Sequence, residues 1–451
     1  MSGESYLDPL GVSVQRFLIF LASCAAIFLY LFTSTGLAQR MASAPPGLPQ
    51  VASDVSAENT RSEHAETLGQ GQGGFGVVYT FKGKDGADPT AALIEDAAGN
   101  LYGTTSAGGE GFGVVFKITS LGRETVLHAF TGKNGDGVDP HGALVLDGLG
   151  NVFGTTSLGG AAGLGIVFKI DASGVETVLY SFTGGDGANP YAGLVMDSSG
   201  NLYGTTENGG TSGLGTVFEI NTGGTESVLH SFAGGTTDGA DPRASLLLDP
   251  DGNLYGTTFA GGSANYGTVF EVDTAKAESI LHSFLGSDGA NPFGGLTRDQ
   301  NGTLYGTAEA GGSLADGLYS CCQGIAAVPR SLPDGPHGCC RGVVFSLDGS
   351  GENVLYAFTG GNDGGTPVGN LALSNGVLYG TTLTAGPGHN GTAFSVTIAS
   401  GTEKVLHGFG GKADGADPYG GLLLSSSGVL YGTAETGGRF KQGTVFQYKI
   451  K

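Results

Sequence analysis

The sequence predicts an all-β fold, namely a seven-bladed β-propeller with four antiparallel strands in each blade. Three observations predict it: a short phrase recurs, its spacing is regular, and the two ends of the folded part are complementary. The phrase is an apolar residue, an aromatic, Gly and Thr, and its seven copies are Leu101–Thr105, Val152–Thr156, Leu202–Thr206, Leu254–Thr258, Leu304–Thr307, Leu378–Thr382 and Leu430–Thr433. Their aromatic residues are separated by 51, 50, 52, 50, 74 and 52 residues. Four-stranded units repeating every ~40–50 residues are typical of propeller blades.

One complete unit, 192–232, shows the four expected strands. They are Ala192–Asp197, Asn201–Thr206, Gly215–Ile220 and Glu226–Phe232, separated by turns rich in Gly, Ser and Asn. We expect each strand to have about five or six residues. The recurring Gly204 marks a close approach by something large. We expect an aromatic of the next blade, such as Phe218, to lie over it.

The two ends of the folded part predict how the ring closes. The folded part begins with Val77–Phe81, which matches the fourth strand of a unit, and it ends with Thr444–Ile450, which matches a third strand. We therefore expect these two segments to pair and to complete the last blade. Closure removes the exposed edges that make β-sheets aggregate.

Composition limits the function classes. The chain has 451 residues, including 87 Gly and no Trp, and its formal net charge is −21. The charge and the absence of a basic stripe exclude a nucleic-acid partner. We expect a monomer.

The N-terminal region predicts export. Arg16 precedes an uncharged, mostly apolar stretch from Phe17 to Ala38. Residues 1–38 are predicted to be a secretory signal peptide or, because the stretch is long, a retained membrane anchor. A lipoprotein-like phrase ending at Cys24 is a weaker alternative. Residues 39–73 are predicted to be a flexible linker, and residues 74–451 the propeller. We expect an extracellular, periplasmic or cell-surface location, with contact to a membrane only through the N-terminal segment.

Histidines recur in the fourth strand, but we interpret them as structural. They are His128, His230, His282 and His407, and equivalent positions carry Tyr180 and Tyr356. A position that alternates between His and Tyr favours packing over ligand binding.

The loops before the first strand and after the second strand are predicted to share one face, where function is usually found in such scaffolds. Asp-Gly-x-Asp/Asn-Pro segments lie in these loops, for example Asp136–Pro140, which includes Asp139. Two carboxylates three residues apart could help to bind Ca²⁺, but a structural turn is favoured. Otherwise we expect no metal and no cofactor.

An insertion at about 313–341 interrupts this pattern and contains four cysteines, Cys321, Cys322, Cys339 and Cys340. Disulfides are favoured over a Cys₄ zinc site, because structural zinc prefers cysteines two to four residues apart. Since His141, His337 and His389 lie in the long loops and outside the repeat register, we select them with Asp136 and Asp139 as candidate binding residues.

The phrases Gly-Asn-Leu-Tyr-Gly-Thr-Thr, Gly-Thr-Val-Phe and Leu-His-Ser-Phe resemble the GloVer tandem-repeat family of bacterial extracellular proteins over about residues 74–451. The resemblance implies export and surface attachment and implies no established enzymatic activity. We expect any anchor to be N-terminal.

Three functions are compatible with the sequence. The first is an extracellular binding or interaction scaffold for a protein or glycan. The second is a propeller enzyme, a lyase or hydrolase acting on carbohydrate or lactone, with its site on the long-loop face. The third is a purely structural surface protein. The first is favoured.

We predict that the four cysteines of the insertion are oxidised in the exported protein, because disulfides form and persist outside the cytoplasm. Thiol titration of the denatured, non-reduced mature chain should find none of these four thiols free. Four free thiols would contradict the disulfide assignment.

Overall fold

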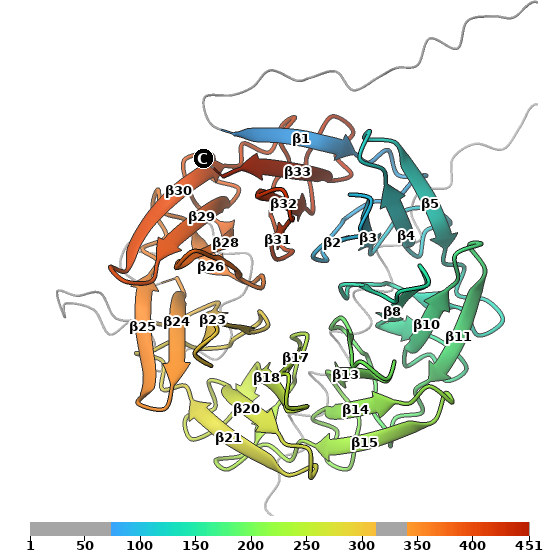
Figure 1. The fold of residues 1–451 in the computed structure, drawn as a ribbon, viewed down its shortest axis with the longest axis horizontal. Coiled ribbons are helices and arrows are strands. Elements are labelled where there is room, and N and C mark those ends of the chain that lie inside the picture. The colour runs from blue at the N-terminus through green and yellow to red at the C-terminus, as the bar shows by residue number, and fades with distance from the viewer. Residues whose placement is uncertain (1–73, 313–340, 451) are drawn as a thin grey trace, which may run out of the picture. The chain divides into compact units, whose positions relative to one another are not determined.

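In the computed structural model, residues 74–312 and 341–450 are described. They form seven antiparallel sheets arranged as blades around a central axis (Figure 1), which confirms the predicted seven-bladed propeller. Every regular element of the described residues is a β-strand. These residues contain no helix with the length and hydrophobicity that a membrane span requires.

The first three blades contain these strands, in order from the axis outward: β2 (Ile94–Glu95), β3 (Leu101–Thr105), β4 (Val114–Ile118) and β5 (Glu124–Ala129); β7 (Val145–Leu146), β8 (Val152–Thr156), β10 (Ile166–Ile170) and β11 (Glu176–Ser181); β12 (Val195–Met196), β13 (Leu202–Thr206), β14 (Thr216–Ile220) and β15 (Glu226–Ser231).

The fourth to sixth blades follow the same order: β17 (Leu247–Leu248), β18 (Leu254–Thr258), β20 (Thr268–Val272) and β21 (Glu278–Ser283); β22 (Thr297–Arg298), β23 (Leu304–Ala308), β24 (Val343–Asp348) and β25 (Gly351–Ala357); β27 (Ala372–Ser374), β28 (Val377–Thr384), β29 (Thr392–Thr397) and β30 (Thr402–Gly408). The last blade consists of β31 (Leu423–Leu424), β32 (Val429–Ala434), β33 (Thr444–Lys449) and β1 (Phe75–Thr80).

The ring closes as the sequence predicts. Strand β1 pairs antiparallel with β33, from Phe75 opposite Tyr448 to Thr80 opposite Thr444. The N-terminal strand is therefore the outermost strand of the last blade (Figure 1).

Threonine hydroxyls join neighbouring blades close to the axis. The first Thr of each recurring phrase donates a hydrogen bond to a backbone carbonyl just before the first strand of the next blade, over 2.7 to 3.3 Å. The seven pairs are Thr104–Gly142, Thr155–Ala192, Thr205–Ala244, Thr257–Gly294, Thr307–Gly369, Thr381–Gly420 and, across the closure, Thr433–Ala91. All seven threonines are buried.

These bonds explain why the innermost strands are shorter than predicted. Most have two residues, because the preceding residues approach the axis and bond to the neighbouring blade instead of to their own sheet. Ala192, for example, was expected to begin a strand, but its carbonyl accepts the hydroxyl of Thr155.

The glycine of the recurring phrase is crowded from within its own blade, not from the next one as predicted. A Cβ on Gly204 would lie 2.7 Å from the ring of Phe218 and 2.9 Å from Leu194. Phe218 is the direct antiparallel partner of Gly204. Alternation along a strand identifies the face of a residue but not which neighbour covers that face.

The inter-blade aromatic contact comes instead from the fourth strand. Phe182, which follows β11, meets Phe218 of the next blade edge to face, with ring centroids 5.1 Å apart. Equivalent pairs join all seven blades, and Phe81 with Phe116 spans the closure at 5.0 Å. Such pairs add stabilisation beyond the area they bury.

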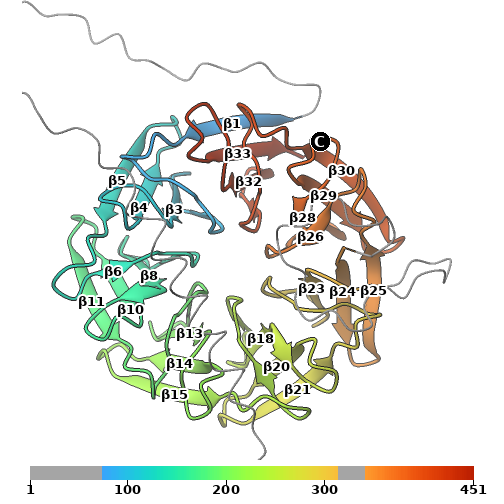
Figure 2. The same cartoon turned by 180° about the vertical axis from the view of Figure 1, so that it is seen from behind.

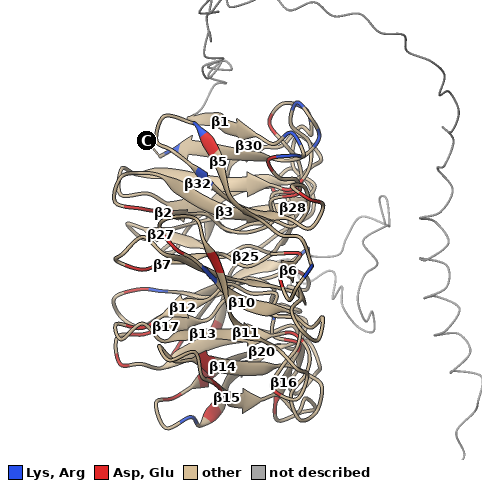
Figure 3. Cartoon of the chain, turned by 90° about the vertical axis from the view of Figure 1, so that its right-hand side faces the viewer, with Lys and Arg blue, Asp and Glu red and all other residues tan. Residues whose placement is uncertain are grey.

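The long loops share one face, as predicted. The loop before the first strand pairs with the loop after the second strand, for instance through β6 (Gly137–Val138) with β9 (Leu158–Gly159) and β16 (Gly239–Ala240) with β19 (Ala260–Gly261). In the sixth blade β26 (Gly365–Pro367) pairs with β28 in the same way. In the side view β6 and β16 lie on one side of the ring and β2, β7, β12 and β17 on the other (Figure 3). Figure 2 views the propeller from the side opposite to Figure 1 and labels β6.

We predict that β1 is required for a stable ring. Deleting residues 1–73 should leave the melting temperature of the propeller unchanged, whereas deleting residues 1–83 removes β1 and Phe81. The second truncation exposes an edge of β33 and should lower the melting temperature by several degrees or cause aggregation. Identical melting curves for the two truncations would contradict the closure.

Candidate functional site

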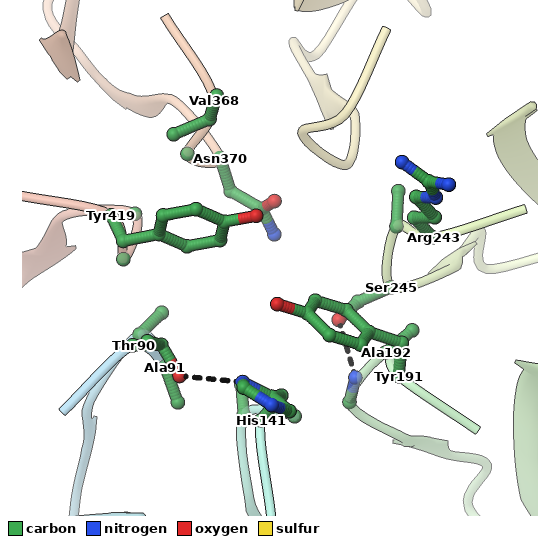
Figure 4. Close-up of a pocket in the computed structure, with 18 of the residues that line it drawn as sticks. Thr90, Ala91, His141, Tyr191, Ala192, Arg243, Ser245, Val368, Asn370 and Tyr419 are labelled. Carbon is green, nitrogen blue, oxygen red and sulfur yellow. Dashed lines mark hydrogen bonds between the residues drawn. The ribbon is translucent and has the colours of Figure 1, made fainter. Parts of the chain in front are cut away.

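The mouth of the axis on the long-loop face is lined by one repeat position that differs from blade to blade. It is the residue immediately after the proline of each Asp-Gly segment. The seven side chains are Thr90, His141, Tyr191, Arg243, Phe293, Val368 and Tyr419, and all seven line the same cavity. All except Phe293 are labelled in Figure 4.

The positions that follow are nearly constant. The residue after the variable position is always Ala or Gly, and the third residue after the variable position is always Leu, as in Leu93 and Leu194. Small residues are needed there because seven segments of the chain converge on the axis. A Cβ on Gly193, for example, would lie 2.5 Å from the carbonyl oxygen of Ala143. The backbone at the mouth is therefore fixed while the ring of buried and half-buried side chains varies.

Aromatic side chains dominate the mouth. Tyr191 stacks on His141 with centroids 4.3 Å apart, and Phe293 meets Tyr191 and Tyr419 edge to face at 5.9 and 5.3 Å. Phe293, Val368 and Tyr419 form a buried cluster. The hydroxyl groups of Tyr191 and Tyr419 point towards the centre of the cavity (Figure 4).

The one arginine of the ring is held by a carboxylate and by aromatic rings. Arg243 Nη2 lies 2.8 Å from Glu207 Oε1, and Nε donates to the same oxygen over 3.1 Å. Its guanidinium lies 4.1 Å from the ring centre of Phe259. The charge of Arg243 is therefore compensated locally, and its side chain is fixed in position.

His141 has a partner for each ring nitrogen. Nε2 lies 2.9 Å from Asp139 Oδ1, and Nδ1 lies 3.0 Å from Thr90 Oγ1. Burial acts to raise the pKa of Asp139, but the hydrogen bond and charge of His141, with the Ser157 hydroxyl, outweigh it and lower that pKa. The carboxylate thus stays ionised and orients the imidazole.

The cavity between these side chains is small. It measures about 60 Å³, whereas pockets that enclose drug-sized ligands have ~300–1,000 Å³. The mouth can admit the tip of a ligand, but it does not enclose a whole substrate.

The structure separates the residues that the sequence selected. Asp139 and His141 lie together at the mouth, and His141 does occupy the repeat register, contrary to the expectation. Asp136 lies 3.3 Å from His128 of the fourth strand, and its other oxygen accepts the backbone N–H of Thr131. His389 is exposed in the β28–β29 loop. His337 and the four cysteines lie outside the described residues.

The two polar positions of each Asp-Gly segment, the first residue and the residue before Pro, have different environments. The residue before Pro adopts a positive φ, as at Asp139 (64°) and Asn189 (56°), which explains the preference for Asp or Asn. In the segment 136–140 the two carboxylates bind different partners, namely His128 and His141.

Sequence reasoning missed most of the mouth, including Tyr191, Arg243, Phe293 and Tyr419. The available signal was the position after proline, which is the one variable site between a constant Pro and a constant small residue.

The recurring histidines and tyrosines of the fourth strand anchor the Asp-Gly loops at the outer rim. Tyr180 donates to Asp186 Oδ2 over 2.6 Å, and His230 Nε2 lies 3.3 Å from Asp238 Oδ1. The same contact recurs at Tyr79–Asp85, His128–Asp136, His282–Asp288, Tyr356–Asp363 and His407–Asp414. This is a structural role, and it explains why His and Tyr alternate.

A glutamate from the next blade reaches six of these seven contacts. The six are Glu124, Glu176, Glu226, Glu278, Glu352 and Glu403, and in each the Oε1 atom is buried with no hydrogen-bond partner among the described residues. We call each set of fourth-strand His or Tyr, loop Asp and next-blade Glu an outer seam. At the seventh position Phe75 stacks on His407, with ring centroids 3.6 Å apart.

Burial raises the pKa of these glutamates. For Glu226 and Glu403 burial is the main cause, the carboxylates of Asp186 and Asp363 add to it, and each pKa reaches about 7. Burial also dominates the rise to about 7 for Glu124 and Glu352.

Fold and site together define a β-propeller with a variable axial mouth on a constant repeat framework. The Gloeobacter/Verrucomicrobia repeat matches residues 67–198, 150–323 and 334–451. The chain belongs to this repeat family, which confirms the resemblance noted in the sequence. No curated protein matches the sequence of this chain.

Solved structures share the fold at low identity. A streptogramin B lyase is 12% identical with a TM-score of 0.54, over 84% of this chain and 97% of its own. A virginiamycin B lyase from Staphylococcus aureus is 11% identical with a TM-score of 0.53, over 84% of this chain and 100% of its own. The extracellular domain of a putative hybrid two-component system from B. thetaiotaomicron is 10% identical with a TM-score of 0.53, over 84% of this chain and 41% of its own. At these identities the likeness shows the fold alone.

We predict that the outer seams make the propeller less stable in alkali. The pKa of Glu226 is higher in the folded than in the unfolded chain, so its protonated carboxyl group stabilises the fold. This contribution to the free energy of unfolding is full below about pH 4.5 and is lost as the pH rises through about 7. Glu226→Gln cannot ionise and therefore avoids this loss. The change that the substitution makes to the free energy of unfolding should be more favourable at pH 8 than at pH 5, by on the order of 1 kcal/mol.

Denaturant unfolding at both pH values measures this difference, with the exposed Glu110→Gln as the matched control. The same change from pH 5 to pH 8 in Glu226→Gln and in the unmodified protein would contradict the raised pKa.

Proposed function

We propose that this protein is an exported binding module that recognises a glycan through the axial mouth of its long-loop face. The single observation that carries the proposal is the ring of seven side chains of six different residue types at one repeat position. Structural positions in this chain repeat their residue types, as the seven threonines near the axis do. This position varies while the residues on either side of it stay constant, so the packing shared by the seven blades does not fix its residue type.

The chemistry of the mouth supports a neutral, hydroxyl-rich ligand. Tyrosine presents an apolar ring together with a hydroxyl, and Tyr191 and Tyr419 direct both towards the cavity (Figure 4). Arg243 pairs with Glu207 and His141 with Asp139, so the mouth offers no uncompensated charge to hold an ion. The small cavity supports recognition of a terminal sugar unit rather than enclosure of a whole molecule.

The Asp139–His141 pair supports a second candidate, an enzyme of the lyase or hydrolase type. A histidine oriented by a carboxylate is a typical general base. Against this, Nδ1 of His141 lies within hydrogen-bond distance of Thr90 and Nε2 of Asp139, so neither nitrogen is directed to a substrate. Binding is therefore favoured over catalysis.

We predict that Tyr191→Ala and Tyr419→Ala each weaken glycan binding at least tenfold, because each removes an aromatic contact and a hydroxyl from the mouth. A glycan array followed by titration calorimetry of the best glycan measures this. Leu149→Ala, at an exposed position of a hairpin on the opposite face, is the control and should bind normally.

An array with no bound glycan, or mouth variants that bind as the unmodified protein does, would contradict the proposed function. Turnover of a bound glycan or lactone that His141→Gln abolishes would favour the enzyme.

A further inference from the structure

Three outer seams differ from the others in carrying a nitrogen ligand beside two carboxylates. They are His128–Asp136–Glu176, His230–Asp238–Glu278 and His282–Asp288–Glu352. In each, one atom from each of the three residues lies within 4.8 Å of the other two. We propose that each of these three seams binds one Zn²⁺ ion between adjacent blades.

The spacing between the histidine nitrogen and the aspartate oxygen fits a tetrahedral ion, and the glutamate oxygen lies within 4.8 Å of both. Ligand atoms about 2.0–2.2 Å from Zn²⁺ lie about 3.3 Å from each other. The distances from His Nε2 to the Asp oxygen are 3.3, 3.3 and 3.1 Å in the three seams. Three protein ligands leave the fourth position for water.

Each of these seams, like the three tyrosine seams, also holds a buried glutamate oxygen that has to be compensated. Oε1 of Glu176, Glu278 and Glu352 is buried with no hydrogen-bond partner among the described residues. Such an atom is costly unless a proton or a cation compensates it. A neutral histidine with two carboxylates carries two negative charges, which a divalent cation neutralises.

The other seams of the same chain serve as natural controls. The seams of Tyr79, Tyr180 and Tyr356 have a phenol in place of the imidazole, and each phenol donates to the loop aspartate without a nitrogen ligand. The His407–Asp414 contact has Phe75 where the others have Glu. Histidine and glutamate thus occur together in three of the seven positions, and only these three have the complete ligand set.

The experiment compares Zn²⁺ stoichiometry of the full-length protein after equilibrium dialysis against Zn²⁺. A triple variant, His128→Tyr, His230→Tyr and His282→Tyr, converts each seam into the tyrosine type that the chain already uses. It should bind three fewer Zn²⁺ ions per chain than the unmodified protein, and each single variant should bind one fewer. Zn²⁺ bound to the cysteines is common to all these proteins and cancels in the comparison.

His407→Tyr is the matched control and should not change the stoichiometry, because its contact has no glutamate. Equal stoichiometry in the unmodified protein and the folded triple variant would overturn the proposal. If the triple variant fails to fold, Glu176→Gln, Glu278→Gln and Glu352→Gln together keep each His–Asp contact and remove one anionic ligand. Unchanged stoichiometry in that variant would overturn the proposal equally.

Discussion

The hydroxyl group of one threonine per blade holds the centre of this propeller together. Each donates to a carbonyl of the next blade, and Thr433 to Ala91 completes the circle. A buried carbonyl left without its donor costs about 1–3 kcal/mol. The bond forms only if the acceptor backbone approaches closely, which restricts the residues there to Ala and Gly. The same restriction sets the width of the axial mouth and fixes the chain that carries its seven variable side chains.

The number of blades and the closure were predictable because both depend on period and register, which a repeat displays directly. The contents of the seams were not, because each seam joins residues about 50 positions apart in two blades. Glu226, for example, is unremarkable at the start of its strand, and only packing places it beside Tyr180 and Asp186. The assignment of Phe218 to the wrong blade has the same origin, because alternation gives a face but no neighbour.

The mouth was missed for a different reason. Sequence reasoning took repeat-register positions as structural and looked for function outside them, so His141 was selected as an exception. The structure shows that His141 shares its position with Tyr191, Arg243 and Phe293. In a symmetric fold, the residues that face the axis must occupy equivalent positions. Variation within one register is therefore the better signal, and a single sequence with seven repeats contains it.

The pairing of β1 with β33 also bears on how the chain folds. The other six blades each form from one continuous segment, so their contacts are local and their loop-closure entropy is small. The last blade joins Phe75 to Tyr448, residues from opposite ends of the ring. Pairing over such a sequence separation is intrinsically slow. An open chain of formed blades is thus the expected species before the native state, and its two unpaired edges are the surfaces that a second chain would meet first.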